Sequence, residues 1–170
     1  MVRVMIDHAR LARPFNSPLE CGLRLLFVLA AAEGTSLDLQ RLIFYDYLLV
    51  HSGDVPGGPV SLHPPVPHRS TELLIRRDLV QLGLNEMFAR ELIQKTLDAR
   101  GINYHSTKLT SAFLMLMQTA YADGLRVRSS WLISEFHHYD DSDLQAYMSK
   151  NIPNWGAEFD NLTAINALEL

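Results

Sequence analysis

One stretch near the middle of the chain limits its fold more than any other. Residues 52–70, SGDVPGGPVSLHPPVPHRS, hold five prolines and three glycines among nineteen residues. Proline fixes φ and lacks a main-chain N–H, so neither a helix nor a central strand can run through this segment. A loop of this length within a compact domain is uncommon and often functional, although a surface excursion packed by its own prolines explains it equally well.

The composition bounds what surrounds this loop. The chain has 170 residues, which predicts one domain with a core of its own, and its 48% hydrophobic and 20% charged residues exclude a wholly disordered protein. One cysteine, Cys21, excludes an internal disulfide and a cysteine-based zinc site. The net charge of −4 does not mark a nucleic-acid binder, although a local basic face stays open.

The hydropathy pattern bears on location. The longest apolar run, residues 25–32, has eight residues, whereas a membrane-spanning helix needs about 20. The first residues also lack the apolar core of a secretory signal. We therefore expect a cytoplasmic protein with no membrane partner.

Two helices are predicted before the loop. Asn16-Ser17-Pro18 is typical of a helix start, and Gly34 is expected to end that helix. Ser36 is expected to cap the next one, over residues 37–50. This second helix is apolar nearly all round, which predicts that it lies in the centre of the domain, buried on most faces.

The segment after the loop predicts a third helix, followed by a stretch that fits either a helix or a β-hairpin. Ser70 or Thr71 can cap a helix that runs to about Gln81 and leaves Arg76 and Arg77 near the solvent side. Gly83 is expected to break it, with a short fourth helix over residues 85–90. Residues 92–107 can continue as helix or form a β-hairpin that turns at residues 98–101. Alternation after the turn favours the hairpin.

Further helices are predicted over residues 108–123, 125–138 and 144–151, with Pro153 ending the last. The expected fold class is therefore mainly α with a small β-hairpin, within one domain over residues 1–170. A winged-helix-like part (17–107, with the Pro-rich loop 52–70) is followed by C-terminal helices (108–155) and an acidic-apolar tail (156–170). This order of elements suits either reading DNA or bridging proteins.

Residues that could carry chemistry are few. His137 and Asp141 are spaced to share a helix face, but two ligands are too few for a metal site. His51, His63 and His68 flank the loop without a nucleophile motif beside them, and no phosphate-binding glycine loop is present. We expect no enzyme, no metal and no cofactor.

Partner binding is the better expectation. Arginine and aromatic side chains dominate the energetics of protein interfaces. The tail has apolar residues at every third position from Phe159, and it can dock on its own domain or on a partner. The candidate partner-binding residues are Arg69, Arg76, Arg77, Arg100, Trp155, Phe159 and Leu162.

Several segments together resemble a known family. They are NSPLECGLRLLFVLAA, SLDLQRLIFYDYLLVHSGD, SLHPPVPHRSTELLIRRDLVQLGL and LIQKTLDARGINYHST, within residues 16–136. In these segments the chain resembles the middle component of bacterial ABC three-component systems, which include Lamassu-type anti-phage and anti-plasmid defence.

The resemblance implies a small accessory subunit without enzymatic activity. Such a subunit bridges the heads of an SMC-like ABC ATPase and accompanies an effector, often a nuclease, and DNA is then met through the assembled complex. The resemblance brings no catalytic motif to carry over. The residues alone leave a second hypothesis open, a winged-helix DNA-binding transcriptional regulator supported by Arg76 and Arg77.

Overall fold

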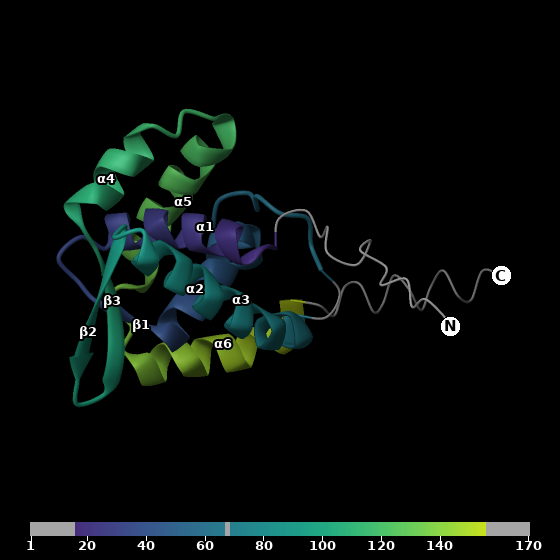
Figure 1. The fold of residues 1–170 in the computed structure, drawn as a ribbon. Helices are drawn as coiled ribbons and strands as arrows, with labels where there is room; N and C mark the ends of the chain where they lie inside the picture. The colour runs from purple at the N-terminus through teal and green to yellow at the C-terminus, as the bar shows by residue number, and fades with distance from the viewer. Residues whose placement is uncertain (1–15, 67–68, 156–170) are drawn as a thin grey trace, which may run out of the picture.

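A computed structural model describes residues 16–66 and 69–155 of the chain. Helices form most of it, and a small sheet lies at one end (Figure 1). The elements in chain order are α1 (Pro18–Ala31), β1 (Leu37–Asp38), α2 (Leu39–Val50), the 3-10 turn η2 (Ser52–Asp54), α3 (Arg69–Ala89), β2 (Ile93–Asp98), β3 (Gly101–Ser106), α4 (Lys108–Met115), α5 (Ala120–Phe136) and α6 (Asp141–Trp155).

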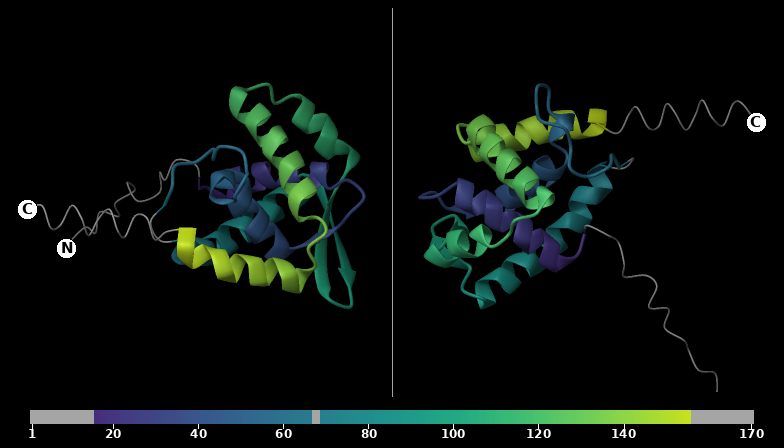
Figure 2. Two further views of the ribbon diagram at one scale, coloured as in Figure 1. Left: turned by 180° about the vertical axis from the view of Figure 1, so that it is seen from behind. Right: turned by 90° about the horizontal axis from the view of Figure 1, so that it is seen from above.

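Helix α2 lies at the centre of the domain. Helices α1, α3, α5 and α6 all pack against it, and the views from behind and from above show it enclosed between them (Figure 2). Every residue from Leu42 to Val50 is buried, including Asp46. The prediction of a central helix buried on most faces is confirmed, and its apolar character on all sides is the cause.

The starts of the first two helices differ in how well they were predicted. Ser17 caps α1 and forms a capping box with Glu20, as the sequence indicates. The prediction that Ser36 caps the second helix is wrong. Leu37 and Asp38 pair with β3 as strand β1, and Asp38 caps α2 by accepting a hydrogen bond from the N–H of Arg41 (2.7 Å).

The ambiguous segment forms the hairpin. Strands β2 and β3 pair antiparallel from Ile93 with Ser106 to Asp98 with Gly101, and the sheet order is β1-β3-β2. Asp98 Oδ1 accepts the N–H groups of Arg100 (2.8 Å) and Gly101 (3.2 Å), which closes the turn. Gly101 has φ +128°, a conformation open to glycine.

Helix α3 does not break at Gly83, so the predicted fourth helix over residues 85–90 is wrong. A Cβ added at Gly83 would lie 2.4 Å from the carbonyl oxygen of Pro18 and 2.6 Å from the N of Gly22. At Gly83, α3 therefore closely approaches the backbone of α1. Tertiary packing explains this glycine, and the helix continues through it to Ala89.

The bounds of the C-terminal helices also differ from the predicted ones. The predicted helix over residues 108–123 is two helices, because Thr119 caps α5 through the N–H of Ala122 (3.1 Å). The Arg126 guanidinium fixes the corner, since it donates to the carbonyls of Leu114 and Met117 where α4 ends, both at 2.6 Å.

The last helix is longer than predicted at both ends. Asp140 accepts the N–H of Asp143 (2.7 Å), which starts α6 a turn early. Pro153 does not end α6; it lies within the last turn, where its ring costs the helix one hydrogen bond.

The predicted fold class, mainly α with a small β-hairpin and C-terminal helices, is confirmed, and strand β1 extends the hairpin to three strands. The order of α1 to α3 before β2 and β3 agrees with a winged-helix-like arrangement, and that family of folds stays a prediction. Among the helices of residues 16–66 and 69–155, none combines the length and the apolar character that crossing a membrane requires.

Candidate functional site

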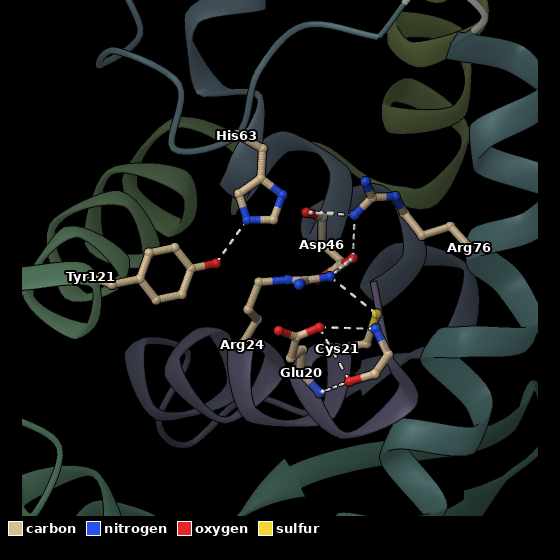
Figure 3. A network of polar contacts seen from close by, with 8 residues as sticks. Glu20, Cys21, Arg24, Asp46, His63, Arg76 and Tyr121 are labelled. Carbon is tan, nitrogen blue, oxygen red and sulfur yellow. Dashed lines mark hydrogen bonds and ion pairs between the residues drawn. The ribbon is translucent and has the colours of Figure 1, made fainter. Parts of the chain in front are cut away.

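A cluster of charged side chains lies buried between α1, α2 and α3. Asp46 of α2 accepts hydrogen bonds from Arg24 of α1, Nε to Oδ1 at 2.8 Å and Nη2 to Oδ2 at 3.0 Å (Figure 3). Arg76 of α3 donates to the same carboxylate through Nη1. The three side chains are at most 2% exposed. One carboxylate thus joins three helices.

The environment fixes the protonation states in this cluster. Burial acts to raise the pKa of Asp46, but the two arginines outweigh it and hold that pKa at about 2. Cys21 accepts a hydrogen bond from Arg24 Nη2 (3.0 Å), and burial raises its pKa to about 12. Asp46 is therefore an anion and Cys21 a neutral thiol near neutral pH, so neither is poised for proton transfer or nucleophilic attack.

The cluster extends to the proline-rich loop through His63. His63 Nε2 lies 2.8 Å from the hydroxyl of Tyr121 on α5 (Figure 3). Burial, followed by the positive charge of Arg24, lowers the pKa of His63 to about 4. His63 is neutral at physiological pH and acts as a link between the loop and the helices.

The loop itself is built onto the domain. The N–H groups of Leu62 and His63 donate to the carbonyl of Val50 at 3.0 and 3.1 Å. On α5, Arg128 donates to the carbonyl of Val60, and a Cβ at Gly124 would lie 2.9 Å from Leu62. Val60 itself is 80% exposed. The exposed Val60 side chain thus lies on a loop whose backbone is anchored to α2 and α5.

The lowered pKa of His63 gives the protein a pH dependence of stability. The pKa falls from the usual 6.5 to about 4 on folding, so the unfolded chain binds a proton that the folded one does not. The protonation of His63 does not reduce the free energy of unfolding above pH 6.5, and it reduces that free energy as the pH drops from 6.5 towards 4. We expect His63→Gln to flatten this slope in urea unfolding at pH 7 and pH 5. An unchanged slope in His63→Gln refutes this source of the pH dependence.

The predicted partner-binding residues whose side chains the structure describes lie in different environments. Arg76 is 2% exposed and bound to Asp46, so the expectation that it lies near the solvent is wrong, because α3 turns this position towards α2. Arg77 of α3 is exposed. Arg100 at the hairpin turn is also exposed, with Nη1 4.0 Å from Asp141 Oδ2.

For the other predicted residues, the structure gives at most their position in a helix. Arg69 begins α3 and Trp155 ends α6. Phe159 and Leu162 lie outside the described residues. The pair considered for a metal is divided: His137 Nδ1 lies 2.9 Å from the carbonyl of Ile133, while Asp141 is bound by Arg41 at 2.7 Å. Within residues 16–66 and 69–155, no group of histidine, cysteine and acidic side chains could hold a metal ion.

Sequence reasoning missed Arg24, Asp46 and Tyr121. A signal for the first two exists: each is a charged residue within an otherwise apolar helix, Arg24 in GLRLLF and Asp46 in IFYDYLL. A charge on the buried face of a helix needs a partner of opposite sign. One arginine and one aspartate in adjacent buried helices are therefore expected to pair. Tyr121 carries no comparable signal.

Comparison with known proteins gives the chain its family. No curated protein and no solved structure matches it. The model of one protein family, described as ABC-three component (ABC-3C) system Middle Component 2, matches residues 14–158. The match includes α1 to α6 and extends over far more than half of the 170 residues. The resemblance to a middle component is thereby confirmed, and the chain belongs to the ABC-three component system Middle Component 2 family.

Proposed function

We propose that this protein is a non-catalytic bridging subunit that binds an SMC-like ABC ATPase and an effector nuclease in a cytoplasmic anti-phage or anti-plasmid defence complex of the Lamassu type. Membership of a middle-component family is the observation that carries this proposal, since a middle component works together with the other components of its system. DNA is met through the assembled complex.

The chemistry of the buried cluster supports a structural role. Asp46 is held ionised by Arg24 and Arg76, and His63 is held neutral. General acid–base catalysis works best with groups whose pKa lies near the operating pH. With pKa values of about 2 and about 4, these groups suit the joining of helices better than the transfer of protons.

The proposed contact surfaces are two exposed features of the described residues and the C-terminal tail. Val60 of the proline loop is 80% exposed, and Arg100 at the hairpin turn has a side chain that is 81% exposed. The tail beyond Trp155, with Phe159 and Leu162, adds an acidic-apolar segment to the set. A subunit with several separate contact surfaces is suited to bridging more than one component.

The test is reconstitution with the companion proteins. The full chain is co-expressed with the ATPase and effector of its own system, and complexes are resolved by size-exclusion chromatography with light scattering. We expect a stable complex that Arg100→Glu or Phe159→Asp weakens by about 30-fold or more, the range of interface hot spots. The isolated variants keep the wild-type circular dichroism and melting temperature. Absence of any complex with either companion refutes the proposal.

The second candidate is a winged-helix DNA-binding regulator. It rests on exposed Arg77 of α3 and on the order of the elements. Burial of Arg76 removes one of the two cations on which this hypothesis depended. Retention of DNA by the isolated chain at about 50 mM salt, with a steep decrease at higher salt, is the result that favours it.

A further inference from the structure

The hairpin has an open edge. The sheet order β1-β3-β2 places β2 at the margin, and β3 is its neighbour on one side. Alternate residues of an antiparallel strand direct their N–H and C=O groups to opposite sides. Among the described residues, no strand pairs with the outer side of β2. A row of main-chain donors and acceptors is therefore available to an added strand, and an extended segment matches it best.

The side chains on one face of β2 change from buried to exposed along this edge. Ile93, Lys95 and Leu97 share one face of the hairpin with their opposite residues on β3. That face is buried at its base, where Ile93 is 1% exposed, and open towards the turn, where Leu97 is 81% exposed. Leu97 and the opposite residue Ile102, which is 50% exposed, form an apolar surface at the turn that the chain alone does not cover.

A hollow at the base of β2 continues this apolar surface. Phe88 at the end of α3 and Leu109 at the start of α4 line it together with Ile93 and Gln94. Phe88 and Leu109 are 46% and 50% exposed. A side chain of an added strand that falls opposite Ile93 enters this hollow. The two ends of β2 thus both favour an apolar residue on the partner.

Between the two apolar positions lies a cation. Lys95 Nζ is 4.5 Å from the centre of the Phe88 ring and 2.8 Å from Asn85 Oδ1. In the part of the chain that the structure describes, no carboxylate forms an ion pair with Lys95. An acidic residue on the added strand, opposite Lys95, complements this charge.

The same lysine disfavours a second copy of this chain as the occupant. Two β2 strands related by a two-fold axis and matched at their apolar ends would set Ile93 against Leu97. That register places Lys95 directly opposite Lys95 of the other copy. Like charges directly opposite destabilise a strand pair, so the edge selects a strand of different sequence.

We propose that β2 is a strand-addition site for an extended segment of a partner protein with the pattern apolar–x–acidic–x–apolar, whose side chains meet Ile93 and the hollow, Lys95 and Leu97. The inference rests on the proposed function, because the partner that supplies the strand is the ATPase component of the same system. It adds to that function the place and the chemistry of one contact.

The experiment combines hydrogen exchange with two variants of the full chain. Amide exchange of residues 93–98 is followed for the chain alone and in complex with the ATPase component. We expect exchange there to slow by about tenfold or more in the complex. Lys95→Glu is expected to weaken binding by about tenfold. Lys95→Met keeps an unbranched side chain of similar length, and it removes the ammonium group with its charge and its hydrogen bond to Asn85. Lys150→Glu on exposed α6 is the matched control and leaves the affinity unchanged.

The outcomes separate the two proposals. A complex that forms with unchanged exchange at residues 93–98 overturns the strand-addition site and leaves the bridging function standing. Unaltered affinity in both Lys95 variants overturns the acidic contact opposite Lys95. If no complex forms, the bridging function fails, and the strand-addition site fails with it.

Discussion

Asp46→Asn will destabilise the protein more than any other single charge change in the described helices. The substitution keeps the size of the side chain but removes the carboxylate that Arg24 and Arg76 share. Removal of one partner from a buried ion pair costs about 3–5 kcal/mol, because the remaining charge keeps its desolvation penalty. Urea unfolding followed by circular dichroism at pH 7 measures this loss.

Asp141→Asn is the matched control for this prediction. It makes the same chemical change at the start of α6, where Asp141 binds Arg41 and its side chain is 55% exposed. Exposed ion pairs contribute about 0–1 kcal/mol, so this variant stays close to the wild type. Equal losses in the two variants contradict the special role of Asp46.

The acid range distinguishes Asp46 further. Its pKa falls from 3.8 to about 2 on folding, so the carboxylate stabilises the folded state above pH 3.8. That stabilisation is lost as the pH falls from 3.8 towards 2. In Asp46→Asn this part of the acid dependence is absent, and the stability curve of the variant is flatter in that interval.

Gly83→Ala is the second large effect, and its sign is the informative part. In an exposed helix interior, replacement of glycine by alanine stabilises by about 1 kcal/mol. At Gly83 the new Cβ would meet the backbone of Pro18 and Gly22, so α1 and α3 must move apart. Overpacking of a core costs about 1–3 kcal/mol, and here the obstructing atoms are backbone. We expect a loss of about 3 kcal/mol or more in urea unfolding.

Gly124→Ala provides the comparison within another helix. A Cβ at Gly124 of α5 would also be crowded, but by the end of the Leu62 side chain at 2.9 Å, which can rotate away. We expect a change within about 1 kcal/mol of wild type. If Gly83→Ala is as mild as Gly124→Ala, the close approach of α1 and α3 at Gly83 is not a determinant of stability.

Local signals in the sequence predicted the elements whose causes are local. The Ser17-Pro18 start of α1, the apolar helix α2 and the hairpin turn at residues 98–101 were all predicted, because caps, periodicity and turn residues act over a few positions. The β1 pairing was not, because Leu37 joins the sheet only through Tyr104, far along the chain.

The errors have a common physical origin in tertiary contacts. Gly83 looks like a helix end when its neighbours in sequence are considered, and its role appears only when α1 packs on it. Arg76 looks solvent-exposed until Asp46 of another helix is placed beside it. For the candidate site, the charged residues within apolar helices could have been found from the sequence, whereas the link from His63 to Tyr121 depends on how α5 packs.

The partners of the shared carboxylate become available in a fixed order while the chain is synthesised. A chain emerges from the ribosome with its N-terminus first. Arg24 and Asp46 are 22 positions apart, so α1 and α2 can make a balanced ion pair before α3 exists. Arg76 then joins as a second cation, and Tyr121 completes the link to His63 only after α5 has been made. The two partners of an electrically neutral ion pair are thus synthesised first, and the residues that join them follow later along the chain.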